Sequence, residues 1–286
     1  MSESHGKHLS VLILSALFIG TSGALGKYIA MPTPVIIWFR SSIGMVALFL
    51  FCKSQHLQFV KLQPKERLPF LTSALFLGGH WITYFLSLKA SNVAIGMLSL
   101  FTFPVMTALL EPFFGKEKFK PMHVFLAVLI LIGIYILAPV VDYENTYFKG
   151  ILLGLLSALF YSIRVLIVKQ FIGKLDSSIL MFYQLAILSV VLIPVLFVFD
   201  ISDIQTQYPY ILFLGLVTTA LGHTLFVRSL KYFSAATASI IASIQPIFGI
   251  LIAIAFLGEI PTLNTIFGGS LILLTVLIES YMSKKS

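Results

Sequence analysis

A polar residue and a proline interrupt an apolar stretch at Ser99-Leu100-Phe101-Thr102-Phe103-Pro104, and an acidic residue, Glu117, follows thirteen positions after the proline. The same arrangement returns at Ser243-Ile244-Gln245-Pro246, where Glu259 again follows thirteen positions after the proline. The two prolines are 142 residues apart, and so are the two acidic residues. Self-similarity at a fixed offset indicates a duplicated structural unit.

Two further matches have the same offset. Leu14-Ser15-Ala16-Leu17-Phe18 returns as Leu156-Ser157-Ala158-Leu159-Phe160, and Ser87-Leu88-Lys89 returns as Ser229-Leu230-Lys231. We therefore predict two repeats, residues 1–145 and residues 146–286.

The composition predicts a polytopic membrane protein. Hydrophobic residues make up 58% of the 286 residues and charged residues only 10%, whereas soluble domains carry about 25% charged residues. The net charge of +8 does not indicate binding of nucleic acid, because the lysines lie in short connections between apolar stretches and form no basic run interleaved with aromatics. The single cysteine, Cys52, excludes an intramolecular disulfide, and we expect neither a metal site nor a cofactor.

Ten stretches are long and apolar enough to cross a bilayer, for which a helix needs about 20 residues. We predict an all-α fold of ten transmembrane helices, arranged as two inverted five-helix repeats. Because the first stretch has a repeat partner, it is expected to belong to the fold and not to a cleaved signal peptide. The predicted segments are 9–29, 34–52, 68–89, 93–115, 122–140, 149–171, 178–198, 208–230, 237–257 and 263–282.

Lysine and arginine predict the orientation of these segments. If both termini share a face, fourteen of the basic residues fall on that face and three on the other, which predicts cytoplasmic termini. Because each repeat has five segments, an odd number, the two repeats must cross the membrane in opposite directions. Equivalent connections then lie on opposite sides, and the basic connection 53–67 accordingly corresponds to the acidic segment 200–203. Inverted repeats are typical of secondary transporters, whose substrate site lies near the bilayer midplane at the repeat interface.

Several polar, aromatic and helix-breaking residues within the segments are candidates for a central cavity. Pro104 and Pro246 each remove a backbone donor near the middle of a segment, and such breaks are either packing kinks or the lining of a cavity. His80 and His223 form a near-symmetric pair at an offset of 143, either as interhelix contacts or as cavity residues. The expected cavity or substrate-binding residues are His80, Trp81, Tyr84, Phe101, Thr102, Tyr161, Arg164, His223 and Gln245.

Ionisable residues within the segments are costly unless they are paired or hydrated. Arg164 and Glu111 lie at similar depth, and we expect them to form an ion pair at a gate on the cytoplasmic side; the alternative is that Arg164 snorkels toward the boundary. Arg40 lies in the outer third, where it is expected to snorkel or to bind a carbonyl group. These three residues are the candidates for gating or proton coupling.

Together, the paired Pro…Glu pattern, Arg40 in the second segment, Gln184 in the seventh and the ten segments resemble the EamA family of the drug/metabolite transporter superfamily over essentially the whole chain. The resemblance implies a transporter with cytoplasmic termini and a central cavity, in which one half rocks against the other. Glu111 departs from the family pattern, because its repeat partner is Ala253, and no family role is carried over to it.

The leading prediction is a secondary transporter in the plasma membrane of a prokaryote, and an exporter in particular, that moves an amino acid or another small amphiphile. Uniport and coupling to protons remain open, as do a monomeric and a homodimeric state. A membrane-embedded enzyme acting on a lipid-linked substrate is the alternative, but it requires carboxylates or histidines clustered at one face. A channel would require rings of polar residues along a pore.

Overall fold

The computed structural model describes residues 2–115, 121–137 and 144–283. These residues are almost entirely helical and contain no β-strand. Glu117, one of the two paired acidic residues, lies outside the described residues. The helices are α1 (Ser2–Tyr28), α2 (Thr33–Ser54), α3 (Pro64–Ala90), α4 (Val93–Leu100), α5 (Phe103–Phe114), α6 (Pro121–Leu137), α7 (Thr146–Lys169), α8 (Ser177–Val191), α9 (Val195–Val198), α10 (Ile204–Phe213), the π-helix η1 (Leu214–His223), α11 (Thr224–Ser229), α12 (Ala235–Ala242), α13 (Gln245–Leu257) and α14 (Leu263–Ser283).

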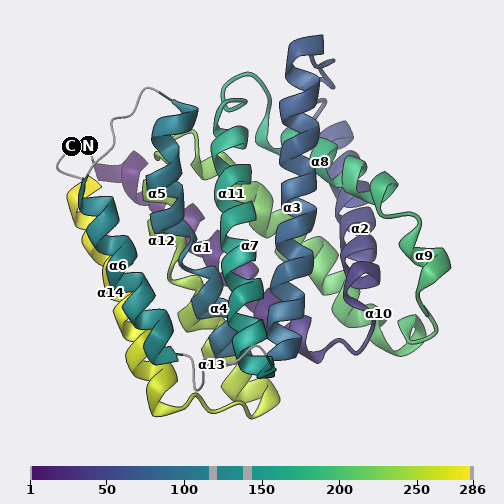
Figure 1. The fold of residues 1–286 in the computed structure, drawn as a ribbon. Coiled ribbons are helices and arrows are strands. Elements are labelled where there is room, and N and C mark those ends of the chain that lie inside the picture. Colours follow the sequence, from purple (N-terminus) through teal and green to yellow (C-terminus); the bar gives the residue numbers. More distant parts are fainter. Residues whose placement is uncertain (1, 116–120, 138–143, 284–286) are drawn as a thin grey trace.

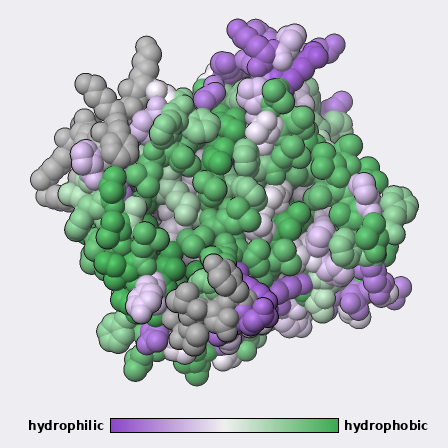
Figure 2. Space-filling model, in the orientation of Figure 1, coloured by the Kyte–Doolittle hydropathy of each residue, from purple (hydrophilic) through white to green (hydrophobic). Residues whose placement is uncertain are grey.

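Each of the ten predicted segments coincides with one or more of these helices (Figure 1). Within the described residues, seven helical stretches are long and apolar enough to cross a membrane, and the remaining three segments contain the shorter apolar helices α6, α13 and Leu263–Thr275 of α14. Figure 2 shows a broad hydrophobic belt with hydrophilic residues gathered toward the two ends of the bundle. The chain is therefore an all-α polytopic membrane protein.

Many neighbouring helices come from opposite halves of the chain. Helix α3 packs against α7 as α1 packs against η1, and α4 and α5 pack against α7 as α13 packs against α1. The remaining pairs, α2 with α8 and α6 with α14, join helices of corresponding position in the two halves (Figure 1). Such exchanged pairs are expected where two inverted repeats face each other across a pseudo-two-fold axis.

Two lysines make equivalent hydrogen bonds in the two halves. At the end of α1, Lys27 donates to the carbonyl of Ser91 over 2.7 Å, and at the end of α7, Lys169 donates to the carbonyl of Phe233 over 2.8 Å. Both donors and both acceptors are 142 residues apart. Each lysine donates hydrogen bonds to carbonyl groups just beyond the end of a helix from the same half. The carbonyl groups at a helix end lack hydrogen-bond partners within the helix.

Two serines likewise make equivalent hydrogen bonds, and these bonds settle the register of the histidines. Ser15 donates to the carbonyl of Gly222 and Ser157 donates to the carbonyl of His80, each over 2.9 Å. The structural equivalent of His80 is therefore Gly222, and the equivalent of His223 is Trp81. His80 and His223 are therefore near-symmetric but not equivalent, and they are one residue out of register, as their offset of 143 indicates.

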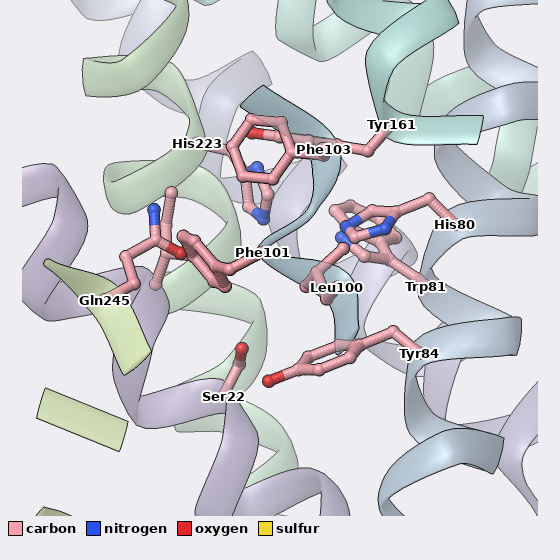
Figure 3. A pocket seen from close by; sticks show the side chains of 11 residues that line it. Ser22, His80, Trp81, Tyr84, Leu100, Phe101, Phe103, Tyr161, His223 and Gln245 are labelled. Atoms are coloured by element: carbon pink, nitrogen blue, oxygen red, sulfur yellow. The ribbon is translucent and has the colours of Figure 1, made fainter. Parts of the chain in front are cut away.

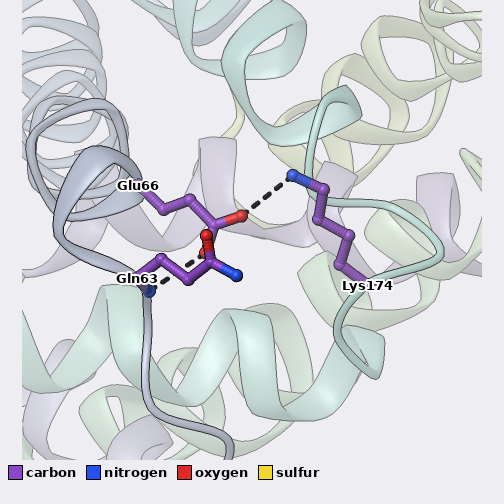
Figure 4. A network of polar contacts seen from close by, with 3 residues as sticks. All are labelled: Gln63, Glu66 and Lys174. Carbon is purple, nitrogen blue, oxygen red and sulfur yellow. Dashed lines mark hydrogen bonds and ion pairs between the residues drawn. The ribbon is translucent and has the colours of Figure 1, made fainter.

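An ion pair joins the two halves at the face where α3 begins (Figure 4). The backbone N–H of Gln63 donates to Glu66 over 3.1 Å in a capping box, which fixes the Glu66 carboxylate at the first turn of α3. The other oxygen of Glu66 lies 2.9 Å from Lys174 Nζ, in the connection after α7. Because the Lys174 side chain is 59% exposed, solvent screens this pair and it adds little to the free energy of unfolding.

Candidate substrate-binding site

A small cavity lies between the two halves, lined from α1, α3, α7, η1 and the two broken segments (Figure 3). Its volume is about 20 Å³, which is room for about one water molecule. The hydroxyl of Tyr84 points toward that of Ser22 at one end, and aromatic rings fill most of the remaining wall (Figure 3). The lining residues are Ile19, Ser22, His80, Trp81, Tyr84, Leu100, Phe101, Phe103, Tyr161, His223 and Gln245.

Seven of the nine residues expected in the cavity line it, and Thr102 and Arg164 do not. The Thr102 hydroxyl, in the break between α4 and α5, is turned back toward the last turn of α4, where it donates to the carbonyl of Ser99 over 2.9 Å. Ile19 and Ser22 were not identified from the sequence. The repeat offset contains a signal for both, because they lie 142 residues before Tyr161 and Arg164.

Two interrupted segments supply part of the cavity wall. Helix α4 ends at Leu100 and α5 begins at Phe103, and in the other half α12 ends at Ala242 and α13 begins at Gln245. Pro104 and Pro246 occupy the first turn of the second helix in each case, where a missing N–H leaves no helical hydrogen bond unmade. The interruption places Phe101 and Gln245 against the cavity (Figure 3).

His80 is held by a reciprocal contact with Ser157. The Ser157 hydroxyl donates to the His80 carbonyl over 2.9 Å and lies 2.7 Å from His80 Nδ1. Because a hydroxyl has one proton, which the carbonyl takes, Nδ1 is the donor to Ser157. The neutral ring then presents Nε2 as an acceptor at the cavity wall.

Arg40 does not snorkel and does not bind a carbonyl, contrary to the sequence-based expectation. Its side chain is 1% exposed, and its guanidinium carbon lies 4.1 Å from the centre of the Trp81 ring. Nε donates to the hydroxyl of Thr219 in η1 over 3.0 Å. A cation on the face of a desolvated tryptophan is stabilised by about 2 kcal/mol, so α2 is tied to α3 and η1 directly beside the cavity.

Arg164 is fully buried in α7, behind the cavity residue Tyr161. Nη2 donates to Gln184 Oε1 over 2.8 Å and to the sulfur of Met181 over 3.0 Å, instead of forming the predicted ion pair with Glu111. Glu111, half-buried in α5, interacts electrostatically with Lys169. The guanidinium carbon of Arg164 lies 5.9 Å from the centre of the Tyr161 ring.

Several buried donors around the cavity are unpaired. Within the described part of the chain, Trp81 Nε1 and both Nε and Nη1 of Arg164 have no hydrogen-bond partner, and Nδ1 of His223 has none either. Among the described residues, no carboxylate forms an ion pair with Arg40 or Arg164. An unpaired buried donor costs about 1–3 kcal/mol, and an uncompensated buried cation costs more. The arrangement is complementary to an anionic group with several acceptor atoms.

Comparison with known proteins identifies similar chains that match over nearly their full length. An uncharacterised transporter of Archaeoglobus fulgidus is 29% identical over 94% of each chain. The pseudopaline exporter CntI of Pseudomonas aeruginosa is 22% identical over 95% of each chain, and the threonine/homoserine exporter RhtA of Salmonella typhimurium is 24% identical over 95% of this chain and 88% of its own.

The fold matches a solved structure, and the sequence matches a family of transporters. One solved structure superposes with a TM-score of 0.73 over 98% of each chain at 16% sequence identity, which shows the shared fold. The EamA-like transporter family matches residues 7–138 and, a second time, residues 148–281. With nearly the whole chain covered by these two matches, the protein belongs to the EamA-like transporter family.

Proposed function

We propose that this chain is a secondary transporter that exports a small zwitterionic solute, such as an amino acid, through the central cavity by alternating access. The observation that carries the proposal is the group of unpaired buried donors around the cavity, together with two guanidinium groups that have no carboxylate partner among the described residues. A solute carboxylate would compensate both charge and hydrogen bonding. The termini are taken to face the cytoplasm of a prokaryote, as the lysine distribution predicts.

The unpaired donors suit the carboxylate of such a solute. Within the described residues, the N–H groups at Nε and Nη1 of Arg164 are free, and each can donate a charge-assisted hydrogen bond to a carboxylate oxygen. Trp81 Nε1 is a further donor on the cavity wall. Rotation of the Tyr161 ring would connect Arg164 to the cavity, because this ring lies between them.

The cavity wall also carries hydrogen-bond acceptors. His80 Nε2 and the amide oxygen of Gln245 are acceptors, and both can receive N–H bonds from an ammonium group. An arrangement with donors from one part of the wall and acceptors from another fits a zwitterion. One similar protein is named a threonine/homoserine exporter, and both of those solutes are zwitterionic amino acids.

The cavity must enlarge to bind such a solute. A volume of about 20 Å³ holds a single water, whereas an amino acid has several times as many heavy atoms. The breaks after Leu100 and Ala242 supply two points at which half-helices can pivot. Because helices from the two halves are paired with one another, rocking of the halves would open the cavity to one side at a time.

The experiment is counterflow in liposomes, with labelled threonine and homoserine and with their carboxamides, which keep the ammonium group and lose the carboxylate. Each measurement is made with and without an imposed pH gradient, which separates uniport from proton coupling. We expect exchange of the acids but not of the amides, and a loss of at least about tenfold in Arg164→Gln, because hydrogen bonds to charged groups are worth about 1.5–3 kcal/mol. Arg67→Gln, which neutralises an exposed arginine, is the control.

Equal transport of acids and amides, or unchanged transport in folded Arg164→Gln, would contradict the proposed chemistry. The recovered solute is also identified by mass. A chemically altered product would support the alternative of a membrane-embedded enzyme.

A further inference from the structure

A second and larger cavity, here called the lateral crevice, opens between α2, η1, α11 and the beginning of α8. Its volume is about 470 Å³. Tyr232 lies at its rim and stacks on His8 near the start of α1, with ring centres 3.4 Å apart. The crevice therefore reaches the face of the bundle at which the chain begins. The cavity lining is Ala47, Leu48, Phe51, Gln55, Leu57, Asp176, Ser177, Ser178, Leu216, Ala220, Leu221, Thr224, Leu225, Arg228, Lys231 and Tyr232.

The end of the lateral crevice nearest this face is polar and positively charged. Arg228 and Lys231 are exposed there, and neither forms an ion pair within the described part of the chain. Asp176 is the one acidic residue in the lining, and it accepts a hydrogen bond from the backbone N–H of Ser178 as the cap of α8. The polar end therefore has a net positive charge.

Two hydroxyl groups in the same lining have no partner. Ser177 is 2% exposed, and its Oγ makes no hydrogen bond to any residue that the structure describes; Thr224 Oγ1 is buried and likewise makes none to these residues. A buried hydroxyl without a partner is destabilising. Both hydroxyls lie on the wall of the crevice, so a ligand with acceptor oxygens bound there would satisfy them.

The side of the lateral crevice is apolar and open along the bundle. Phe51 is 49% exposed, and Leu216 and Leu221 are each 45% exposed. The helical stretch from Leu216 to the end of α11 at Ser229 rises by roughly 20 Å, which matches one leaflet, about half of a 30 Å hydrocarbon core with its headgroup region. A ligand that fills the crevice is therefore apolar along most of its length and anionic at one end.

We propose that the lateral crevice binds one anionic phospholipid from the leaflet at this face. The phosphate lies between Arg228 and Lys231 and accepts hydrogen bonds from Ser177 and Thr224, and one acyl chain lies along Phe51, Leu216 and Leu221. A basic pocket between transmembrane helices at the membrane surface is the kind of site that binds anionic headgroups. The exposed apolar half, within the hydrophobic belt, favours a lipid over a soluble anion.

The test is native mass spectrometry of the full chain released from nanodiscs of phosphatidylcholine with a minor fraction of phosphatidylglycerol. We expect the wild type to retain one phosphatidylglycerol in preference to phosphatidylcholine. Arg228→Gln/Lys231→Gln should lower this preference by roughly 30-fold, from the loss of two cations near the surface. Lys61→Gln/Lys65→Gln, which removes one exposed lysine from the connection after α2 and one from the first turn of α3, should leave it unchanged.

A second variant keeps the test decisive if the double glutamine variant does not fold. Leu221→Trp fills the apolar side and should reduce retention of both lipids, with no change in the preference of any lipid that remains. A wild type without preference for phosphatidylglycerol, or an equal loss in the Lys61/Lys65 control, would overturn the proposal. Displacement of the lipid by inorganic phosphate would also overturn it, because the site would then bind a free anion.

Discussion

The ring of Trp81 meets the imidazole of His223 edge to face, with ring centres 5.2 Å apart, and the two residues are separated by the repeat offset of 142. Equivalent positions of the two halves thus touch at the centre of the protein. They carry different side chains, so a duplicated backbone frames an asymmetric site. On one side the Arg40 guanidinium stacks on the indole ring of Trp81. On the other side Nδ1 of His223 has no hydrogen-bond partner within the described residues. An asymmetric site suits a solute with different groups at its two ends.

Trp81→Phe tests the contribution of the indole N–H. The phenyl ring keeps a surface on which Arg40 can stack, whereas the donor at Nε1 is lost. We expect the half-saturation concentration for threonine counterflow to rise by about 10- to 100-fold, the value of one hydrogen bond to a charged group, while the thermal midpoint changes little. Trp81→Leu should lower the midpoint as well, because it removes the aromatic face under a buried cation. An unchanged half-saturation concentration in Trp81→Phe would contradict the assigned role.

Much of the fold followed from the repeat offset and the apolar stretches. Helices lie in all ten predicted segments, and two of the segments are interrupted next to Pro104 and Pro246. Both features were predictable because the length of an apolar segment and the position of a proline can be read directly from the sequence. The cavity was also largely predictable. Polar and aromatic residues at helix breaks and beside glycines would be unfavourable in contact with lipid, so they are expected to face the interior of the bundle.

The pairing of charged residues was not predictable in the same way. Arg164 and Glu111 were placed at equal depth, but depth does not determine the direction in which a side chain leaves its helix. Arg164 instead reaches Gln184, whose amide nitrogen donates to Ser73 in α3 over 2.8 Å. Arg40 was expected to snorkel or to bind a carbonyl group, because nothing in its own segment indicated that its guanidinium would stack on Trp81.

The two lysines at corresponding helix ends should contribute similarly to stability. Lys27→Met and Lys169→Met each remove a charged donor from buried carbonyls, and each should lower the free energy of unfolding by about 1.5–3 kcal/mol. The sites are at opposite ends of the bundle, so the effects should add in the double variant. Thermal unfolding in detergent provides the measurement. Lys149→Met is the control, because Lys149 lies 3.7 Å from a Glu144 that is 91% exposed, and its loss should have almost no effect.

Glu259 links the acidic position of the second repeat to the first half of the chain. Its Oε2 accepts the backbone N–H of Val93, the first residue of α4, over 2.7 Å. Glu259→Ala should lower the free energy of unfolding by about 1–3 kcal/mol, because a helix-terminal N–H loses its partner. Glu259→Gln retains an amide oxygen as acceptor and should recover much of the loss. Equal destabilisation by the two variants in thermal unfolding would show that the carboxylate acts through its charge and not through this bond.

The ion pair between Glu66 and Lys174 should hold the face at which α3 begins in its closed state. The single cysteine, Cys52, is fully buried in α2 at this face and lies close to Asp176 at the start of α8, so its reaction with a maleimide reports separation of α2 from α8. Lys174→Glu replaces attraction by repulsion with Glu66 and should increase the labelling rate several-fold, with little change in the thermal midpoint because the Lys174 side chain is 59% exposed and solvent screens the pair.

The reversed pair Glu66→Lys/Lys174→Glu restores the attraction and should return the labelling rate toward that of the wild type. Lys149→Glu makes the same charge change at an ion pair between near neighbours in the sequence, Glu144 and Lys149, and it should leave the rate unchanged. High salt should increase labelling of the wild type and have less effect on Lys174→Glu, because screening weakens an attraction that the variant lacks. If the reversed pair labels as fast as Lys174→Glu, the contact packs the two connections together without controlling their separation.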